Sequence, residues 1–215
     1  MTQDAIRLQK EIAERVVTHD DFDLNSIRRI CGVDVAYGDG NIAYCSAVVM
    51  EAEEKEEVEG AKNGRGMVVV DSADLKTTAK FPYIPGLLML REAEPMIRTL
   101  AILKKDYDLL LVDGNGRLHP RKCGLACYLG VTLDKPAIGV AKSRLCGTVR
   151  PDCFVEMKGE VLGYVIDKKK LYISVGHRIS LESAVAIVQK LGIEPLRLAD
   201  INSKAQKRRG KGLKR

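Results

Sequence analysis

Two periodicities of apolar and polar residues follow one another along this chain, and they predict its helices and strands. Apolar side chains recur every three or four positions in residues 2–18, which predicts an amphipathic helix. Three runs rich in β-branched and apolar residues then predict strands at residues 29–37, 42–52 and 67–75. The turn-forming sequence YGDGN at 37–41 joins the first two runs and predicts a hairpin.

The second half of the chain alternates helical and strand-like segments. Helices are predicted from the start of a Leu-rich segment near Leu87 to about Lys105, and over residues 123–133 and 180–191. Strands are predicted at residues 108–113, 136–141, 161–166 and 171–175. Meandering strands followed by alternating helices and strands favour one α/β domain over residues 1–203, with a mixed central sheet flanked by helices on both faces.

The net charge of +6 comes from one end of the chain. Residues 204–215, KAQKRRGKGLKR, hold seven Lys or Arg and no acid, so the rest carries 28 basic against 29 acidic residues. We expect a disordered basic tail from residue 204 that adds salt-sensitive phosphate contacts, or one that only aids solubility. The Glu-rich segment at 51–66 is expected to form a solvated hairpin tip, to which no function is assigned.

Composition narrows the class of protein further. No apolar run approaches the ~20 residues of a membrane helix, and residues 1–4 do not begin a signal peptide, so we expect a cytoplasmic protein without a membrane partner. The six cysteines form no CxxC pair, which favours free thiols over a zinc site or disulfides.

Two aspartates occupy positions that a purely structural role explains poorly. Asp34 lies in the middle of a predicted strand, where carboxylates are disfavoured, and the small Gly32 and Ala36 on the same face leave space above it. Asp113 ends the apolar run LLLV, and ligands gather at the carboxyl ends of such buried strands. The alternatives are an edge-strand aspartate facing water and a simple turn former before Gly114.

Glu92 is a third candidate acid. A helix beginning near Leu87 would turn Glu92 inward, whereas a helix beginning at Pro95 would leave it just before the start. In both cases it lies among apolar residues and needs a cation, either an arginine or a metal ion. Three carboxylates without a histidine-rich cluster are the hard oxygen ligands that Mg²⁺ or Mn²⁺ prefers, and such ions serve phosphoryl chemistry.

Three basic side chains complete the candidate chemistry. His119 lies in a basic loop after Asp113, and His177 follows a predicted strand, where it could bind an ion or assist proton transfer. Lys142 ends another apolar strand, where its ammonium could hold a phosphate. Structural histidines and an ordinary exposed lysine are the alternatives.

The stretch FPYIPG at 81–86 holds one tyrosine between two prolines. Proline fixes its own φ and biases the preceding residue toward an extended conformation, so Tyr83 stands on a stiff turn. A rigid aromatic ring beside a carboxylate site can stack on bases or wedge between them. The alternative is a tyrosine packed into a proline-rich turn.

Five motifs, in this order, resemble one known family, endonuclease V, the deoxyinosine 3′ endonucleases. They are GVDVAY at 32–37, PYIPG at 82–86 followed by Arg91-Glu92, VDGNGRLHPR at 112–121, GVAKSRLCG at 139–147 and GHRIS at 176–180. The resemblance covers roughly residues 29–192 and implies a ribonuclease H-like fold. It also implies a magnesium-dependent DNA repair enzyme that cuts the second phosphodiester bond 3′ to deoxyinosine and leaves 3′-hydroxyl and 5′-phosphate ends.

The resemblance also implies roles for particular residues. Asp34, Glu92 and Asp113 match the family's metal-binding acids, and His177 matches an additional active-site position. Tyr83 matches the wedge that fills the gap left by the flipped base. Lys142 is implied to lie near the scissile strand and to have a catalytic role. The residues implied to contact DNA besides Tyr83 are Pro82, Ile84, Gly86, Arg91, Gly114, His119 and Lys142.

Two other functions remain open from the sequence. A ribonuclease H-like enzyme for RNA·DNA hybrids would use similar acids, and a non-catalytic module would bind nucleic acid through its basic tail. We expect inosine-containing DNA as the partner, single-stranded RNA as a second candidate substrate, and a monomeric protein with Mn²⁺ able to replace Mg²⁺.

Overall fold

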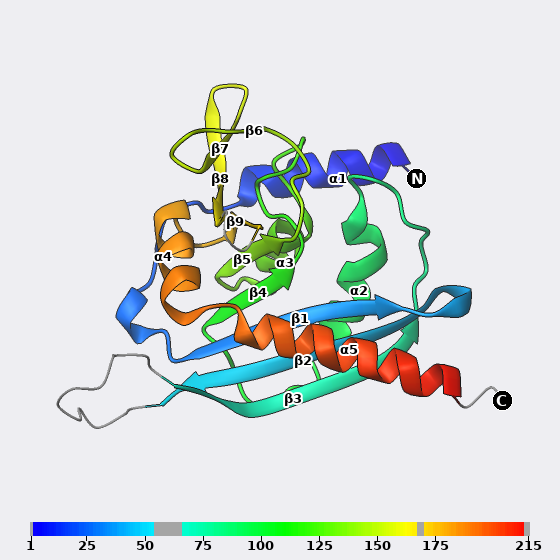
Figure 1. Cartoon of the computed structure of the whole chain (residues 1–215). Helices are drawn as coiled ribbons and strands as arrows, with labels where there is room; N and C mark the ends of the chain where they lie inside the picture. The colour runs from blue at the N-terminus through cyan, green and yellow to red at the C-terminus, as the bar shows by residue number, and fades with distance from the viewer. Residues whose placement is uncertain (1, 54–65, 167–169, 213–215) are drawn as a thin grey trace.

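A mixed β-sheet forms the centre of the computed structural model, which describes residues 2–53, 66–166 and 170–212, with side chains to Gly210. Its nine strands in the described residues are β1 (Arg29–Tyr37), β2 (Ile42–Ala52), β3 (Met67–Thr78), β4 (Leu109–Asp113), β5 (Ala137–Ala141), β6 (Thr148–Val149), β7 (Phe154–Met157), β8 (Glu160–Ile166) and β9 (Leu171–His177). Their spatial order is β3-β2-β1-β4-β5-β9-β8-β7-β6 (Figure 1). β1, β4 and β5 are parallel and the other pairs antiparallel. This confirms the predicted mixed sheet.

Helices cover both faces of this sheet. They are α1 (Thr2–Arg15), α2 (Leu88–Leu100), α3 (Leu125–Leu133), α4 (Leu181–Leu191) and α5 (Glu194–Gly212), with short 3₁₀ turns η1 (Leu24–Ser26) and η2 (Asp39–Asn41). α5 lies across β1 and β2 on one face, and α2 and α3 lie on the other, with α1 against α3 (Figure 1). No helix in the part of the chain that the structure describes has the length and apolar character to cross a membrane.

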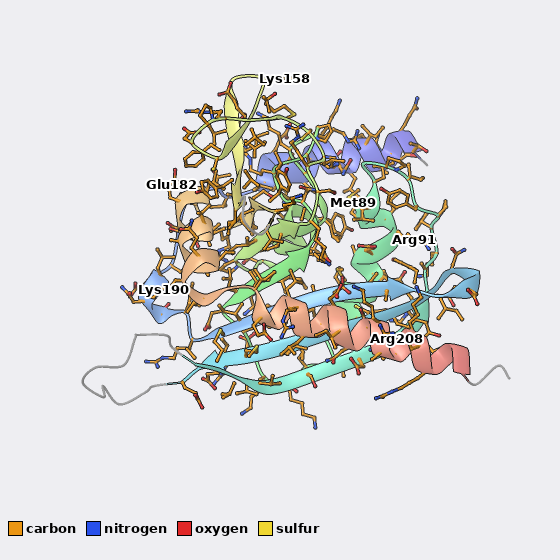
Figure 2. All side chains as sticks on the ribbon, in the orientation of Figure 1. Met89, Arg91, Lys158, Glu182, Lys190 and Arg208 are labelled. Carbon is orange, nitrogen blue, oxygen red and sulfur yellow. The ribbon has the colours of Figure 1, made fainter. Side chains whose placement is uncertain are left out.

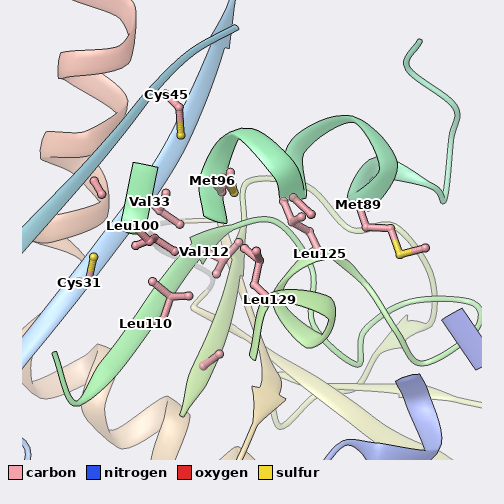
Figure 3. Close-up of a cluster of buried hydrophobic side chains, with 14 of the residues drawn as sticks. Cys31, Val33, Cys45, Met89, Met96, Leu100, Leu110, Val112, Leu125 and Leu129 are labelled. Carbon is pink, nitrogen blue, oxygen red and sulfur yellow. The ribbon is translucent and has the colours of Figure 1, made fainter. Parts of the chain in front are cut away.

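β4 is buried on both faces, as its unbroken apolar run predicts. Leu110 and Val112 belong to the cluster between the sheet and α2 and α3, which Figure 3 shows in close-up. Leu109 and Leu111 point the other way, into the cluster beneath α4 and the start of α5. Side chains of a strand alternate between its faces, so four successive apolar residues fill two cores. The strand that carries Asp113 is therefore fixed from both sides.

The first two strands begin and end where the sequence predicts, and they pair as the expected antiparallel hairpin. β2 also pairs with β3. The tip between them, residues 54–65, lies outside the described residues, so the expectation for the Glu-rich segment stays a prediction. The six cysteines are free, as predicted.

α2 begins before Pro95, which decides between the two alternatives for Glu92. Proline within a helix removes the hydrogen bond to the carbonyl four residues earlier, here that of Arg91. The hydroxyl of Tyr37 donates to this Arg91 oxygen at 3.3 Å. A side chain from β1 thus supplies the missing donor, and Glu92 lies inside the helix. The helix ends at Leu100, five residues earlier than predicted.

The basic segment differs from its prediction. Residues 204–212 continue α5 instead of forming a disordered tail. Leu196, Ala199 and Ser203 form a buried stripe on this helix, and Gly32 of β1 lets the helix approach the sheet, since a Cβ there would overlap the backbone of Leu196. Local composition is strongly basic, but packing of the preceding turns on β1 and β2 extends the helix through it.

Candidate metal centre and nucleic-acid site

Three aspartates from three elements converge at one edge of the sheet. Carboxylate oxygens of Asp34, Asp113 and Asp200 all lie within 4.8 Å of one another. Asp34 and Asp113 follow the paired residues Val33 and Val112 of the parallel strands β1 and β4, so the register places them side by side. Asp200 reaches the same point from α5. The pairing of β1 with β4 brings together two of the three acids that the sequence singled out.

Asp200 is the functional candidate that sequence reasoning missed. It lies between the last predicted helix and the basic segment, where no element was expected. The available signal was the spacing of Leu196, Ala199 and Ser203, apolar or small residues three and four positions apart. This spacing predicts a helix with one buried face, and Asp200 adjoins that face.

Two lysines neutralise part of this acidic cluster. Lys142 Nζ donates to Asp113 Oδ2 at 2.7 Å and to Asp200 Oδ1 at 3.2 Å, and Lys204 Nζ donates to Asp200 Oδ2 at 2.7 Å. Burial by itself would lower the pKa of Lys142, but the hydrogen bonds and charges of the two aspartates raise it above its usual value. Lys142 follows β5, the parallel neighbour of β4, so the end of this strand places it beside the acidic cluster.

Asp34 is the most enclosed of the three aspartates, with 7% of its surface exposed. Burial raises the pKa of its carboxyl to about 6, the Ser203 hydroxyl opposes this by donating to Oδ2 at 2.7 Å, and the charges of Asp113 and Asp200 raise it further. The space expected above Asp34 is filled by α5, because Gly32 admits this helix. Its environment thus combines a helix-borne hydrogen-bond donor with two other carboxylates.

Glu92 lies near the cluster but outside the set of oxygens within 4.8 Å of one another. Burial raises the pKa of its carboxyl to about 8, and the charges of Asp34 and Asp113 add to this shift. Its role as a metal ligand therefore stays a prediction.

Arg91 departs from its predicted contact with DNA. Arg91 lies in the first turn of α2 (Figure 2). Its side chain is buried, and its guanidinium donates to the carbonyl of Phe81 at 2.8 Å and to Asn41 Oδ1 at 3.2 Å. It also stacks 4.1 Å from the centre of the Tyr37 ring. These contacts direct it inward, so Arg91 anchors the start of the proline-rich turn to the β1–β2 hairpin.

His177 lies at the opposite end of the sheet from the acidic cluster. β9 runs antiparallel to β5, so His177 pairs with Ala137 at the beginning of β5, whereas Asp113 pairs with Val140 near its end. Its Nδ1 accepts a hydrogen bond from the backbone of Val17 at 3.2 Å. The sequence shows that His177 ends a strand but not the direction of that strand. The predicted active-site role for His177 is therefore not supported by its position.

The proline-rich turn presents Tyr83 to solvent, with 64% of its surface exposed. Pro82 is exposed as well, whereas Ile84 packs against the core cluster beneath α2 and so does not face outward as the predicted DNA contact requires. Gly86 ends the turn with a φ of 76°, in the left-handed region that favours glycine. The turn thus projects one aromatic ring from a fixed base.

A cavity of about 290 Å³ connects this turn to the acidic cluster. Six of the predicted site residues line it: Tyr83, Gly86, Asp113, Gly114, His119 and Lys142. His119 is almost fully buried, with 3% of its surface exposed, and its Nε2 donates to the carbonyl of Gly86 at 3.1 Å. The cavity therefore places a metal-ligand candidate and a rigid tyrosine in one concave site.

The three aspartates fit a divalent cation of the magnesium type. They offer only hard carboxylate oxygens, converging from separate elements to within the spacing of ligands around one or two small ions. Burial and mutual repulsion raise the pKa of Asp34, a cost that a bound cation relieves. Soft-metal chemistry has no support here, because no His or Cys joins this cluster in the described residues.

A ribonuclease H-like sheet with acids converging at its edge defines the class of metal-dependent nucleases. Comparison with known proteins identifies the family within this class. The endonuclease V family model matches residues 10–201, and the chain belongs to the endonuclease V family. It is accordingly a nuclease, a hydrolase that acts on DNA.

Relatives and solved structures agree over nearly the whole chain. An endonuclease V of Thermofilum pendens is 43% identical over 218 residues, which cover 95% of this chain and 88% of that protein. The crystal structure of endonuclease V from Streptomyces avermitilis matches with a TM-score of 0.84 at 29% identity, covering 98% of this chain and 95% of the other. Ciona intestinalis endonuclease V, in complex with DNA containing an inosine followed by a ribo-adenosine, matches with a TM-score of 0.77 at 28% identity, covering 94% and 96%.

Proposed function

We propose that this chain is a DNA repair endonuclease that recognises deoxyinosine and hydrolyses the second phosphodiester bond 3′ to it, leaving 3′-hydroxyl and 5′-phosphate ends. The observation that carries the proposal is the shared cavity, since Asp113 belongs both to the acidic cluster and to the cavity that Tyr83 lines. The inosine-containing DNA bound by the Ciona relative supports the choice of lesion.

Asp34, Asp113 and Asp200 would hold the metal, which we propose to be Mg²⁺ with Mn²⁺ as a substitute, and Glu92 would contribute from α2. When bound, such an ion supplies Lewis acidity that activates water and stabilises the leaving oxygen of a phosphodiester. Ser203 orients the carboxylate of Asp34 through its hydrogen bond. The hard oxygen set and the raised pKa of Asp34 support this assignment.

The neighbouring side chains would hold the DNA. Lys142 is a cation beside Asp113, and its ammonium can donate to a phosphate oxygen as readily as to a carboxylate. The exposed ring of Tyr83 would fill the gap left by an extruded base, and the cavity beside Gly114 would take that base. Extrusion costs less at a mispaired or damaged base, which contributes to selectivity.

A cleavage assay tests the proposal. A labelled DNA strand with one hypoxanthine and the same strand with adenine are incubated in Mg²⁺, in Mn²⁺ and with chelator. We expect one cut, at the second phosphodiester bond 3′ to hypoxanthine, which chelator abolishes. Asp113→Asn should abolish the cut, whereas Asp152→Asn, on an exposed turn away from the cavity, should retain it. No cut on either strand by folded wild-type protein would contradict the proposal.

The same assay separates the two nucleic acids that the site could accept. A single-stranded RNA with one inosine is compared with the DNA strand at equal concentration. We propose DNA as the preferred substrate, so the DNA strand should be cut with the higher kcat/KM. Faster cutting of RNA would move the assignment to an RNA-directed enzyme of the same chemistry.

A further inference from the structure

Gln9 on α1 is a buried polar residue that the proposed chemistry does not use. The buried face of α1 consists of Ala5, Gln9 and Ile12, and only 1% of the Gln9 surface is exposed. A buried amide is costly unless its donors and acceptor are hydrogen-bonded. Gln9 thus interrupts the apolar stripe of the helix with one acceptor oxygen and two N–H donors, all of which need hydrogen-bond partners.

The hydrogen bonds of Gln9 reach Gly86, which lines the cavity with it, and two residues of the loop after β4. Gln9 Nε2 donates to the carbonyl of Gly86 at 3.1 Å and to that of Cys123 at 2.8 Å, and Gln9 Oε1 accepts from Arg121 Nε at 2.6 Å. Because carbonyls only accept and a guanidinium only donates, these partners fix the orientation of the amide. Gln9 thereby links the N-terminal helix, the proline-rich turn and the loop after β4.

The carbonyl of Gly86 is where these links converge. It accepts hydrogen bonds from three side chains: Gln9 at 3.1 Å, His119 Nε2 at 3.1 Å and Arg121 Nη2 at 2.6 Å. The other end of the turn is held by Arg91 through the carbonyl of Phe81. The turn is therefore fixed at residues 81 and 86, and Tyr83 projects from the span between these anchors.

We infer that Gln9 is a positioning residue for lesion recognition, acting through Gly86 and Arg121. Gln9 and Gly86 line the same cavity as Tyr83. Without the amide, Gly86 loses one donor, and Arg121 loses the acceptor that aims its guanidinium at the Gly86 carbonyl. The orientation of the turn relative to the acidic cluster then becomes less defined. The inference rests on the proposed function, since it concerns how the cavity selects a deaminated base.

The decisive variant is Gln9→Met, which keeps the length of the side chain and removes its hydrogen-bonding groups. A matched control is Gln3→Met, the same change at an exposed position of the same helix. Cleavage of hypoxanthine and adenine strands is measured in Mg²⁺ under single turnover, with the strand concentration varied. We expect Gln9→Met to raise the half-saturating concentration for the hypoxanthine strand by about tenfold, as for a lost buried hydrogen bond, and Gln3→Met to behave as wild type.

If Gln9 had only a structural role, its loss would also change the rate at saturation and the Mg²⁺ dependence of cleavage. We expect the rate at saturating hypoxanthine strand and the half-saturating Mg²⁺ concentration to stay within twofold of wild type in Gln9→Met, because the acidic cluster does not contact Gln9. Gln9→Glu should be as defective as Gln9→Met, since it keeps an acceptor for Arg121 but turns a carboxylate toward two carbonyls. If Gln9→Met does not fold, Arg121→Met removes the same link from the other side and should show the same loss.

Three results would overturn the inference. They are unchanged hypoxanthine affinity in Gln9→Met, an equal loss of affinity for both strands, and wild-type selectivity in Gln9→Glu. A wild-type protein that cuts the hypoxanthine strand selectively while Gln9→Met does so equally well contradicts this inference alone. A wild-type protein without preference for hypoxanthine contradicts the proposed function, and the inference with it.

Discussion

The acids at the site lie close together, with Asp34 buried and the others half-buried, and their direct partners decide what each charge costs. Burial raises the pKa of Asp34 to about 6 and that of Glu92 to about 8. Burial acts in the same sense on Asp200, but hydrogen bonds from Lys204 and Lys142 bring its pKa below the usual value. Ionisation is therefore unfavourable for Asp34 and Glu92, the carboxyls without a direct lysine contact, and a cation bound beside them would reduce this cost.

We expect the burial of His119 to make the free energy of unfolding depend on pH. Burial lowers its pKa to about 4, helped by the charge of Arg121 and opposed by the hydrogen bond to Gly86. The folded protein therefore keeps His119 neutral in a range where the unfolded chain binds a proton. The free energy of unfolding should fall by about 3 kcal/mol as pH drops from about 6.5 to 4, and His119 should contribute no further loss below that.

The variant His119→Gln keeps a donor for Gly86 and removes the titration. Urea unfolding of both proteins between pH 7.5 and 4.5 checks the prediction. The difference in unfolding free energy between wild type and His119→Gln should shift against the wild type as pH falls. Parallel pH profiles would show that His119 does not titrate differently in the folded and unfolded states.

We expect the exposed ring of Tyr83 to contribute to the selectivity for hypoxanthine over adenine. Stacking of an aromatic side chain on a base contributes about 1–3 kcal/mol, so Tyr83→Ala should reduce the preference for hypoxanthine over adenine by about fivefold or more. Tyr83→Phe keeps the ring and should retain that preference. Competition between the two strands in one reaction measures the ratio directly. An unchanged ratio in Tyr83→Ala would remove the wedge role, whatever its effect on the rate.

At the scale of elements, α5 completes the site. It supplies Asp200 to the cluster and Ser203 to Asp34, and its position depends on the absence of a side chain at Gly32. A helix that delivers ligands has to be placed within a fraction of an ångström, and close packing on β1 provides that precision. The site thus depends on the contact between α5 and the sheet as much as on the strand ends.

Gly32→Ala tests this dependence. The added methyl group would overlap the backbone of Leu196, so α5 must shift, at a cost of about 1–3 kcal/mol in unfolding free energy. Metal-dependent cleavage should fall more than stability alone explains, because Asp200 and Ser203 move with the helix. Gly159→Ala, in the turn between β7 and β8, is the control, because its added methyl group meets nothing within 4 Å and costs stability only through the φ of 78°. Equal activity in both variants, measured where both are folded, would contradict the role of α5.

At the scale of the whole molecule, three separate parts of the chain meet in the acidic cluster, so metal binding should stabilise the complete fold. A ligand that binds only the folded state at a hundred times its Kd adds about 2.7 kcal/mol. For a protein of this size, Mg²⁺ should then raise the thermal unfolding midpoint by about 5–10 °C relative to NaCl of equal ionic strength.

Asp200→Asn should reduce this Mg²⁺-dependent rise, whereas Asp152→Asn should preserve it. Differential scanning fluorimetry with Mg²⁺, NaCl and chelator measures all three proteins under the same conditions. A rise of equal size in Asp200→Asn would show that α5 does not contribute to the metal site.

The sequence by itself determined the elements with strong local patterns. β1 and β2 were predicted at their observed bounds, because alternation and the turn YGDGN are local signals. The same holds for Asp34 and Asp113, since a carboxylate in a strand or at its end conflicts with its neighbours in sequence. The motifs also determined the family and, with it, the ribonuclease H-like fold.

Only the tertiary structure decided which of these residues meet. The direction of β9 sends His177 to the far end of the sheet, and the packing of α5 brings Asp200 to the near end. Arg91 turns inward because Tyr37 and Asn41 lie beside it, partners more than 45 residues away in sequence. Strand direction, helix placement and side-chain partners depend on contacts between distant segments, and a pattern of neighbouring residues does not contain them.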